Sequence, residues 1–333
     1  MYKDILFLED VKYSTRQNVL NFVKVWNSKA DYITVNTSGS TGYPKQIKIL
    51  KSKMRASANA TVKFFELEPG QTILMTLSAE YIAGKMLIVR AIENNLKLII
   101  APVSSNPLLI DLNHKIHFSA FVPLQVQTIL ENTTSKRNYQ LIDKVIIGGG
   151  EINKALEKKI SNLTNSNFAT FGMTETISHI ALRNISKDES HYTALPNVDF
   201  SVNSSQCLII NAPLINSKID LQTTDIVDLL NSKQFIWKGR ADFVINSGGI
   251  KLNPEILERK IESLIPNNRY YFKGEKDDLL GERLILKIEN ISPLNLSELK
   301  EQLKQKLDKI ELPKSILLVD QFSETKTGKI IRN

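Results

Sequence analysis

Cysteine and long apolar runs are scarce in this sequence of 333 residues. Cys207 is the single cysteine, so the chain cannot form an internal disulfide and nothing ties it to an oxidising compartment. The best apolar stretch, residues 96–103, contains Lys97 and falls well short of the ~20 residues that a membrane-spanning helix needs. The opening residues MYKDILFLED carry acidic side chains and lack the apolar core of a secretion signal. We therefore expect a cytoplasmic protein without a membrane span.

Signatures of several other classes of protein are absent too. The sequence shows no zinc-ligand spacing, no aromatic RNA-binding motif, no heptad array and no internal repeat. The net charge is +8, from 43 basic and 35 acidic residues, but the positive side chains are interspersed with acidic ones. This distribution favours a solvated basic surface, able to attract small polyanions such as nucleotides, over a nucleic-acid partner.

Short apolar segments alternate with helical patterns over most of the chain. The segments expected to form strands are residues 32–35, 47–50, 72–77, 97–101, 144–147 and 207–210. The patterns expected to form helices are residues 52–66, 83–93, 123–132 and 151–163. This alternation predicts an α/β domain with a largely parallel sheet.

The last part of the chain has a different pattern. Its expected helices are residues 254–264 and 297–310, and its expected strands between them are residues 269–273 and 283–288. We therefore predict a larger α/β domain at residues 1–240 and a small α+β domain at residues 241–333.

The strongest local signal is the segment TSGSTGYPK at residues 37–45. Glycine permits backbone angles that other residues resist, hydroxyl groups donate hydrogen bonds, and the closing lysine supplies a point charge. Such a loop can wrap a polyphosphate, although many clusters of this composition are polar surface turns. It is not a Walker A motif, because Tyr43 and Pro44 precede Lys45 and Gln46 follows it. The expected phosphate-binding residues are Thr37, Ser38, Gly39, Ser40, Thr41, Gly42 and Lys45.

TSGSTGYPK resembles the phosphate-binding signature of the acyl- and aryl-CoA synthetase family of adenylate-forming enzymes. Further signatures of that family recur in the expected order: IIGGGE at residues 146–151, FGMTE at 171–175, TTD at 223–225, GRADFVINSGGIKLNPEILE at 239–258 and TKTGK at 325–329. The resemblance covers nearly the whole chain. It implies a large adenylate-forming N-terminal domain, shortened in this chain, and a small mobile C-terminal domain.

The resemblance also implies an acid–thiol ligase that uses ATP, Mg²⁺ and coenzyme A. In that family a substrate carboxylate attacks the α-phosphate of ATP, pyrophosphate leaves, and the CoA thiol then displaces AMP from the acyl-adenylate. By this resemblance Thr174 contacts the α-phosphate and Glu175 holds Mg²⁺, a hard cation that suits carboxylate oxygens. The other residues expected to border the nucleotide here are Phe171, Gly149, Gly150 and Glu151.

Residues further along the chain complete the implied site. Asp225 matches an aspartate that binds both ribose hydroxyls, although Thr224 stands where relatives usually have glycine. Arg240 matches an arginine that also contacts the ribose, and Lys329 matches the catalytic lysine of adenylation. Asp242 matches the hinge about which the small domain swings between the two half-reactions. The residues expected to guide the CoA thiol are Ser247, Gly248, Gly249 and Lys251.

Two segments indicate which acid is used. FGMTETISH at residues 171–179 and YIAGKMLIVR at residues 81–90 are similar to o-succinylbenzoate–CoA ligases of menaquinone biosynthesis. Tyr81 stands where family members generally carry histidine, and it keeps an aromatic wall. Because o-succinylbenzoate has two carboxylates, Lys85 is a candidate cation for the second one; a lysine exposed on a first helical turn is the alternative interpretation. Candidates to line the aryl pocket are Ser178 and His179, although a buried histidine with its hydrogen bonds satisfied within the fold is the commoner case.

Several alternatives stay open at this point. The chain could act on another aryl or medium-chain acid, or it could load a carrier-protein thiol with phosphopantetheine docked at residues 247–251. A degenerate, non-enzymatic nucleotide-binding module is disfavoured, because the charged site residues are all retained; nucleic-acid binding comes last. Only 36 residues precede the phosphate loop, fewer than in relatives. We therefore expect a front subdomain to be missing or reduced, which leaves open how one wall of the acid pocket is built. A homodimer is one way to supply it.

Overall fold

The computed structural model describes residues 4–36, 46–215, 220–266, 268–324 and 330–332. The chain forms two compact units. The first comprises Met1–Phe200, Ile210–Leu221 and Asn231–Gln234, and the second comprises Ser201–Ile209, Gln222–Leu230 and Phe235–Asn333. Within the described segments, no helix combines the length and the apolar character that crossing a membrane requires.

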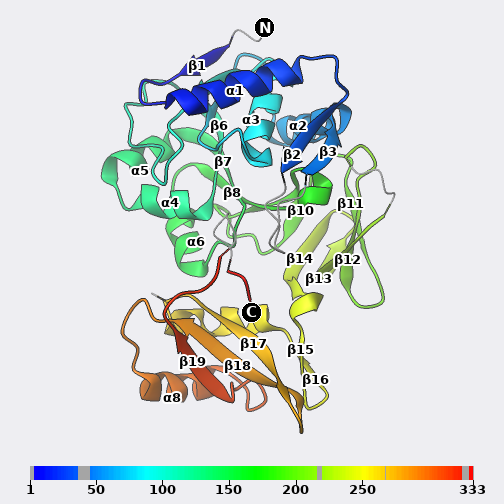
Figure 1. Cartoon of the computed structure of the whole chain (residues 1–333), viewed down its shortest axis with the longest axis vertical. Coiled ribbons are helices and arrows are strands. Elements are labelled where there is room, and N and C mark those ends of the chain that lie inside the picture. The colour runs from blue at the N-terminus through cyan, green and yellow to red at the C-terminus, as the bar shows by residue number, and fades with distance from the viewer. Residues whose placement is uncertain (1–3, 37–45, 216–219, 267, 325–329, 333) are drawn as a thin grey trace. The chain divides into compact units, whose positions relative to one another are not determined.

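A mostly parallel sheet runs through the first unit (Figure 1). Its strands, in spatial order, are β1 (Ile5–Phe7), β5 (Lys97–Ile100), β4 (Thr72–Met75), β6 (Ile116–Phe121), β7 (Ile142–Ile147), β8 (Ser166–Gly172), β9 (His179–Asn184) and β10 (Tyr192–Ala194). Neighbouring strands are parallel from β1 to β8, whereas β9 is antiparallel to both β8 and β10. The predicted α/β class with a largely parallel sheet is therefore confirmed.

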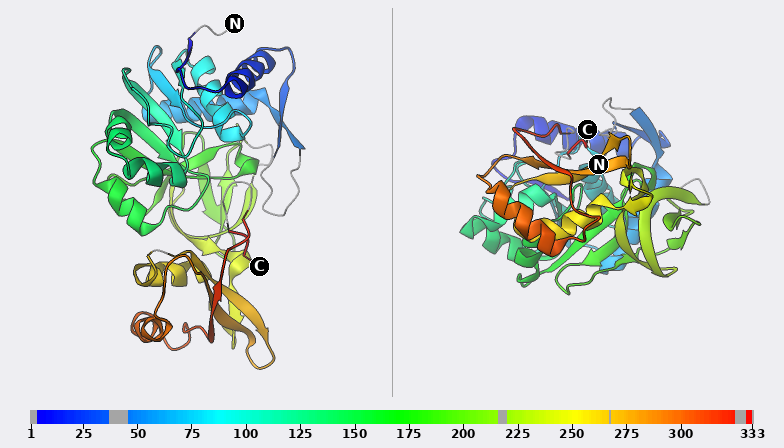
Figure 2. Two further views of the ribbon diagram at one scale, coloured as in Figure 1. Left: turned by 60° about the vertical axis from the view of Figure 1, so that its left-hand side comes forward. Right: turned by 90° about the horizontal axis from the view of Figure 1, so that it is seen from below.

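Helices cover both faces of this sheet, as Figures 1 and 2 show. They are α1 (Tyr13–Trp26), α2 (Lys51–Phe65) and α3 (Ile82–Glu93) in one group, and α4 (Pro123–Leu130), α5 (Thr133–Gln140) and α6 (Lys154–Ser161) in the other. Helices α4–α6 pack on the strands through fully buried Val126, Tyr139 and Ile160. On the other face, the ring centroid of Phe65 in α2 lies 5.3 Å from that of Phe118 in β6. Burial on both faces explains the continuous apolar runs within β4, β5 and β7, which are residues 73–75, 98–100 and 145–147.

Two strands near the N-terminus stand apart from the parallel sheet. β2 (Tyr32–Asn36) and β3 (Gln46–Leu50) pair with each other in antiparallel fashion, and Asn36 lies opposite Gln46. A parallel pair needs a long crossover, whereas a short connection joins antiparallel neighbours. The antiparallel pairing of β2 with β3 is therefore the kind that a short connection allows. The predicted phosphate loop, residues 37–45, lies outside the described residues, but the strands at its two ends are paired with each other.

Four more strands lie side by side in the order β14 (Gln234–Arg240), β13 (Leu221–Asn231), β12 (Cys207–Asn211) and β11 (Asp199–Val202). A separate sheet in the second unit has the order β16 (Ile250–Leu252), β15 (Ile245–Ser247), β18 (Gly281–Glu289) and β17 (Tyr270–Asp277), with β19 (Ser315–Val319) parallel to β18. Helices α7 (Pro254–Ile261) and α8 (Leu296–Lys306) share its apolar core, which includes Leu257, Leu286 and Leu303. This arrangement confirms the predicted α+β character of the C-terminal part.

Candidate active site

The glycine-rich and FGMTE segments leave the same edge of the parallel sheet. Gly148–Glu151 follows the last residue of β7, and FGMTE spans the end of β8. The two strands are parallel neighbours, with Ile147 opposite Ala169. Ligands of α/β sheets bind outside the carboxyl ends of the strands, which is where both segments emerge. The fold therefore brings these two motifs together.

The turn after β8 is closely packed around Gly172. A Cβ atom at residue 172 would lie 2.5 Å from the carbonyl oxygen of Ser178, so the backbone of Ser178 occupies the space that a side chain would need. The buried hydroxyl of Thr176 accepts a hydrogen bond from the Met173 amide (2.9 Å) and lies 2.8 Å from the Ser178 carbonyl. These contacts fix the short 3-10 helix η1 (Thr174–Thr176) at the sheet edge.

Ile177 closes this turn in a strained conformation. Its φ is 67° and its ψ is −50°, and the Ser178 amide donates to the Thr176 carbonyl at 2.7 Å. This is the rare γ-turn with positive φ, which is costly for a β-branched residue. Strain of this kind persists only where the surroundings impose it, and it concentrates at functional sites. The strained residue lies two positions after Glu175, the last residue of the motif that carries the proposed chemistry.

The turn presents Thr174 and Glu175 to solvent, because both side chains are exposed. Among the described residues, no group of three or more His, Cys, Asp and Glu side chains could form an all-protein metal cage. Mg²⁺ commonly binds through one or two carboxylates and completes its shell with substrate phosphates and water. An exposed carboxylate beside a phosphate-binding edge fits that mode of binding, so Glu175 is a suitable ligand for Mg²⁺.

Phe171 forms an aromatic wall with Tyr192 at the end of β8. The two ring centroids are 5.7 Å apart, and the guanidinium of Arg183 lies 5.7 Å from the Tyr192 ring. Arg183 also forms an ion pair with Glu157 of α6. Burial raises the pKa of Tyr192, so the phenol stays neutral in this setting. The wall is a suitable flank for a planar base.

Tyr81 and Lys85 lie at the start of α3. Tyr81 is the N-cap residue and is 47% exposed. The ammonium of Lys85 donates to the backbone carbonyls of Ala79 (2.5 Å) and Glu80 (2.7 Å), and burial lowers its pKa. These hydrogen bonds join Lys85 to the turn that precedes its own helix, and its ammonium also lies 5.7 Å from the centroid of the Phe22 ring in α1.

Arg90 is a candidate that the motifs did not identify. It lies further along α3, is only 1% exposed, and donates from Nη2 to the hydroxyl of Ser178 at 3.0 Å. Its Nε has no hydrogen-bond partner, and none of the ion pairs among the described residues includes Arg90. Burial lowers the pKa of this guanidinium. The signal in the sequence was an arginine on the apolar face of a predicted helix, where a charge needs a partner.

The second unit places the proposed ribose-binding residues in one cluster. Asp225 in β13 is 6% exposed and accepts a hydrogen bond from the indole of Trp237 at 2.9 Å. Burial raises the pKa of Asp225 and outweighs the opposing effects of Trp237 and of the Arg240 charge. Arg240 donates to the hydroxyl of Thr224 at 2.9 Å and forms an ion pair with Asp242.

Thr224 has a defined role in this cluster. Its hydroxyl accepts from Arg240 and lies 3.2 Å from a carboxylate oxygen of Asp242, so it bridges the two residues. Asp242 belongs to the short 3-10 helix η2 (Ala241–Phe243), the predicted hinge. A glycine at position 224 could not make this bridge.

The segment proposed to guide the CoA thiol is a tight hairpin turn. Ser247 of β15 pairs with Ile250 of β16, which leaves Gly248 and Gly249 as the two turn residues, with φ of 59° and 81°. Two consecutive positive φ angles define a type I′ turn, which glycine tolerates without strain. The Ser247 side chain is buried, whereas Lys251 is exposed.

Lys329 lies outside the described residues, but the flanks of its segment are anchored. Glu324 bridges to Ile330 across the gap, and Glu324 also forms an ion pair with Arg269. Arg332 donates to both carboxylate oxygens of Glu258 in α7, at 2.8 and 2.7 Å. Both ends of the TKTGK segment are therefore attached to the second unit.

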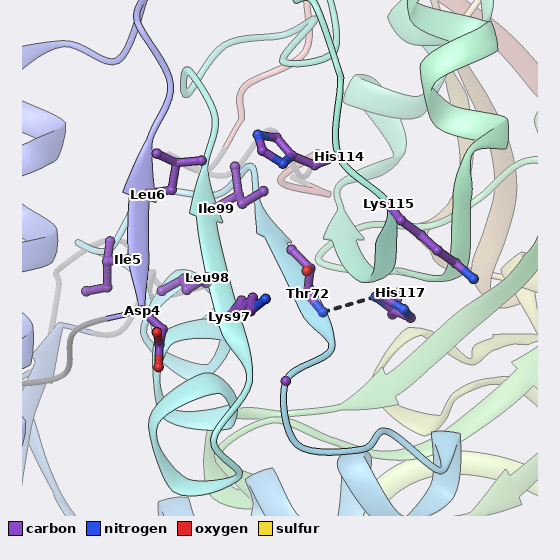
Figure 3. Close-up of a pocket in the computed structure, with 11 residues that line it drawn as sticks. Asp4, Ile5, Leu6, Thr72, Lys97, Leu98, Ile99, His114, Lys115 and His117 are labelled. Atoms are coloured by element: carbon purple, nitrogen blue, oxygen red, sulfur yellow. Dashed lines mark hydrogen bonds between the residues drawn. The ribbon is translucent and has the colours of Figure 1, made fainter.

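A cavity of about 500 Å³ in the first unit is unrelated to these motifs (Figure 3). It lies where β1, β5, β4 and β6 begin, and its lining includes Asp4, Thr72, Lys97 and His117. The amide of Thr72 donates to Nδ1 of His117 at 3.0 Å. The amino ends of parallel strands lie at the opposite edge of a sheet from their carboxyl ends. This cavity therefore cannot be the acid pocket.

Comparison with known proteins gives consistent results for sequence and structure. A family model described as AMP-binding enzyme matches residues 6–213. A 2-succinylbenzoate–CoA ligase of Lactococcus lactis subsp. lactis (strain IL1403) is 24% identical over 363 residues, which cover 99% of this chain and 79% of that protein. For several other ligases of the same name, the match covers 64% to 67% of their own length. The chain thus spans about two thirds to four fifths of the length of these relatives.

Two solved structures extend the comparison. An acyl-CoA synthetase (AMP-forming)/AMP-acid ligase II-like protein from Dyadobacter fermentans DSM 18053 is 34% identical, with a TM-score of 0.67 over 98% of this chain and 94% of that one. The O-succinylbenzoate Coenzyme A Synthetase from Bacillus subtilis, in complex with ATP and magnesium ion, is 19% identical, with a TM-score of 0.78 over 90% of this chain and 68% of that one. The second likeness establishes the fold that the two chains share.

Proposed function

Because this chain belongs to the family of AMP-binding enzymes, we propose that it is an ATP-dependent acid–CoA ligase, and specifically an o-succinylbenzoate–CoA ligase of menaquinone biosynthesis. The observation that carries the proposal is the placement of two family motifs at one sheet edge. Gly148–Glu151 and the Thr174–Glu175 turn follow parallel neighbouring strands, and a strained residue holds the turn. The alternative substrates are another aryl acid or a medium-chain acid.

In the first half-reaction a carboxylate oxygen of the acid attacks the α-phosphorus of ATP. The bond to pyrophosphate breaks, and an acyl-adenylate forms. Thr174 contacts the α-phosphate, Glu175 holds the magnesium ion, and Lys329 bridges the carboxylate and the phosphate. Mg²⁺ supplies positive charge to the phosphate oxygens when it is bound. Attacker and target are both anionic, so the main task of these residues is to neutralise charge.

The nucleotide is held by the remaining residues predicted from the motifs. The phosphate loop at residues 37–45 wraps the β- and γ-phosphates, Phe171 and the Gly149–Glu151 segment border the adenine, and Asp225 with Arg240 binds the ribose. The burial of Asp225 and its hydrogen bond with Trp237 support this role, because they fix the carboxylate in one orientation.

In the second half-reaction the CoA thiol attacks the acyl carbonyl carbon. The carbon–oxygen bond to AMP breaks, and a thioester and AMP result. We infer that residues 241–333 act as the mobile domain, with Asp242 as its hinge, and that the turn at Ser247, Gly248, Gly249 and Lys251 guides the pantetheine. Two half-reactions at one site are the reason for such a domain. The cytoplasmic location and a homodimer stay predictions.

A second carboxylate on the substrate has a suitable partner in Arg90. A buried guanidinium without an acidic partner among the described residues favours a ligand that brings its own negative charge. Tyr81, Lys85 and Ser178 stay candidates for the pocket wall, and the contacts of Lys85 with two carbonyls make Arg90 the better placed cation. This supports a dicarboxylic aryl acid over a simple fatty acid.

The direct test supplies purified protein with ATP, Mg²⁺, CoA and a panel of acids, and measures AMP release. We expect o-succinylbenzoate to be turned over faster than benzoate or a medium-chain fatty acid. Equal rates for all three would contradict the substrate assignment. Absence of pyrophosphate exchange into ATP with every acid would contradict the proposed chemistry itself. Replacing CoA by a holo-carrier protein tests the alternative acceptor.

A further inference from the structure

A series of four hydrogen-bonded polar side chains, three of them buried and one half-buried, lies behind the Thr174–Glu175 turn. Thr61 of α2, His179 of β9 and Arg90 of α3 are 0%, 6% and 1% exposed, and Ser178 connects the last two. The distances are 3.2 Å between Thr61 Oγ1 and His179 Nε2, 3.3 Å between His179 Nδ1 and Ser178 Oγ, and 3.0 Å between Ser178 Oγ and Arg90 Nη2. All four residues belong to the first unit.

The positions of the protons in this chain follow from its two ends. At one end, the Thr61 hydroxyl donates to the carbonyl of Ser57 at 3.2 Å, a bond that threonine often makes within a helix. Because the hydroxyl has only one proton, the Thr61 oxygen can only accept from His179, whose Nε2 must then carry a proton. At the other end, a guanidinium can only donate, so the Ser178 oxygen accepts from Arg90. The Ser178 proton is then free to point at His179 Nδ1, which carries no proton in this tautomer.

The other protonation states of His179 fit less well. In the Nδ1–H tautomer, Nε2 would carry no proton and would face the Thr61 oxygen, whose own proton goes to the Ser57 carbonyl. His179 is buried, and a buried polar atom without a partner is costly. An imidazolium would add a second positive charge beside Arg90 in a buried site. Burial and the Arg90 charge both lower the pKa of His179, well below its ordinary value. The neutral Nε2–H form therefore satisfies both ring nitrogens and both hydroxyl groups.

We propose that Thr61, His179 and Ser178 form a one-directional hydrogen-bond relay that fixes the orientation of the Arg90 guanidinium. His179 is then a neutral positioning residue, not a proton donor or acceptor in the reaction. Ser178 follows the strained γ-turn at Ile177, so the same relay connects Arg90 to the turn that carries Glu175. The link from Arg90 to a substrate carboxylate rests on the proposed function, whereas the relay itself does not.

The first experiment does not require catalysis. Imidazole nitrogen chemical shifts, measured by NMR on protein labelled with ¹⁵N histidine, report the tautomer and charge of His179 directly. We expect the neutral Nε2–H form between pH 5.5 and 8 in the parent protein, and the same form in Thr61→Ser. Thr61→Val removes the acceptor for Nε2–H and should release the ring into a mixture of tautomers. An imidazolium or a pure Nδ1–H form in the parent protein, or an unchanged spectrum in Thr61→Val, would overturn the relay.

A second pair of variants covers the case in which Thr61→Val does not fold. In His179→Asn the new side chain places an oxygen near the position of Nδ1 and can still accept from Ser178. In His179→Gln the longer side chain places its amide near the position of Nε2 and cannot. We therefore expect His179→Asn to keep the affinity for a dicarboxylic acid within about threefold, and His179→Gln to raise the KM for that acid about tenfold. The KM for ATP should stay unchanged in both variants, and equal behaviour of the two would contradict the relay.

The two kinds of measurement separate the two claims. If the parent protein shows no pyrophosphate exchange with any acid, the proposed function is wrong, and the nitrogen shifts still decide the relay. If exchange is normal and the shifts report a charged His179, the function stands and the relay is wrong.

Discussion

Arg90 keeps a positive charge in a site that is almost fully buried. Transfer of such a group out of water costs several kcal/mol unless a counter-charge and hydrogen bonds compensate for it. One nitrogen bonds to Ser178 and another has no partner, so compensation within the described residues is incomplete. A carboxylate brought by a ligand would complete it. The residue is therefore expected to lower stability in the free protein and to raise affinity for an acidic substrate.

Arg90→Met tests this balance. Methionine has similar length and no charge, so it removes both the cost of burial and the cation. We expect the melting temperature to stay equal or to rise, and kcat/KM for o-succinylbenzoate to fall on the order of a hundredfold. The turnover of benzoate, which has no second carboxylate, should change much less. The measurements are thermal unfolding and steady-state AMP release with both acids.

Lys85→Met is the matched control, since Lys85 lies on the same helix and contacts only carbonyls in its described hydrogen bonds. If kcat/KM for o-succinylbenzoate falls more in Lys85→Met than in Arg90→Met, then Lys85 is the residue that binds the second carboxylate. That result would contradict our assignment of this role to Arg90.

At the scale of elements, the strands β17 and β18 are joined to the C-terminal segment by a cluster of charges. Arg269 forms ion pairs with Glu289 and with Glu324, and the amide of Phe322 donates to Glu289 at 2.9 Å. Glu289 is only 2% exposed. The hydrogen bonds from Arg269 lower the pKa of Glu289 below its ordinary value. Glu289 therefore stabilises the fold only while its carboxylate is ionised.

We expect this cluster to make stability depend on pH in the acid range. Because the folded pKa of Glu289 lies below the unfolded value of about 4.3, the carboxylate contributes its full stabilisation above that value. The contribution is lost as pH falls through the folded pKa. Glu289→Gln should lower the free energy of unfolding at pH 7 by ~2–3 kcal/mol and flatten its dependence on pH below 5. Urea unfolding at a series of pH values provides the measurement.

Lys304→Met is a suitable control for the loss of one charge, because the pair of Lys304 with Glu301 is exposed on α8. It should change stability by less than ~1 kcal/mol at every pH. A slope below pH 5 that is as steep in Glu289→Gln as in the parent protein would assign the acid sensitivity to other carboxylates.

The elements that could be predicted from the sequence are those buried on both sides. β4, β5 and β7 each contain a continuous apolar run of three buried residues, because helices cover both faces of their sheet. The helices between them follow the 3.6-residue period. β13 has mixed burial along its eleven residues and gives no such run. The pairing of β2 with β3 could not be predicted either, because the residue pattern of a strand does not show which other strand it pairs with.

The same limit applies to the site. FGMTE and the glycine-rich segment could be recognised because each is contiguous, and the structure places them at one sheet edge. Arg90 and Ser178 are 88 positions apart, and only the packing of α3 against the turn reveals their contact. Thr224 could be noticed in the sequence as part of the TTD segment, but its bridge between Arg240 and Asp242 could not. That bridge depends on the pairing of two strands, which the sequence alone does not show.

At the scale of the whole molecule, the two proposed half-reactions should be separable by mutation. Lys329→Ala removes the cation that we propose bridges carboxylate and phosphate during adenylation alone. We expect acyl-AMP formation to fall by a factor on the order of 10²–10³. Conversion of supplied acyl-AMP and CoA into thioester should stay within about twofold, because that step displaces AMP without this lysine. Rapid-quench assays of each half-reaction give the two rates, and an equal loss of both would contradict a residue specific to one step.

The proposed hinge offers the complementary test. Asp242 lies in the first turn of η2, where backbone N–H groups have no intrahelical partner, so proline removes no helical hydrogen bond there. Asp242→Pro should therefore fold and carry out adenylation. It should slow thioester formation by about tenfold or more, equivalent to ~1.4 kcal/mol in the barrier, because proline resists a change in backbone angles.

Asp242→Pro also removes the ion pair with Arg240 and the bridge through Thr224, so the comparison needs a variant that loses only the side chain. Asp242→Ala serves this purpose. If rotation at residue 242 matters, alanine should keep the second step close to the parent rate or accelerate it, since the bridge that restrains the backbone is gone. A loss of the second step that is equal in the alanine and proline variants would assign the effect to the carboxylate and rule out a hinge at this position.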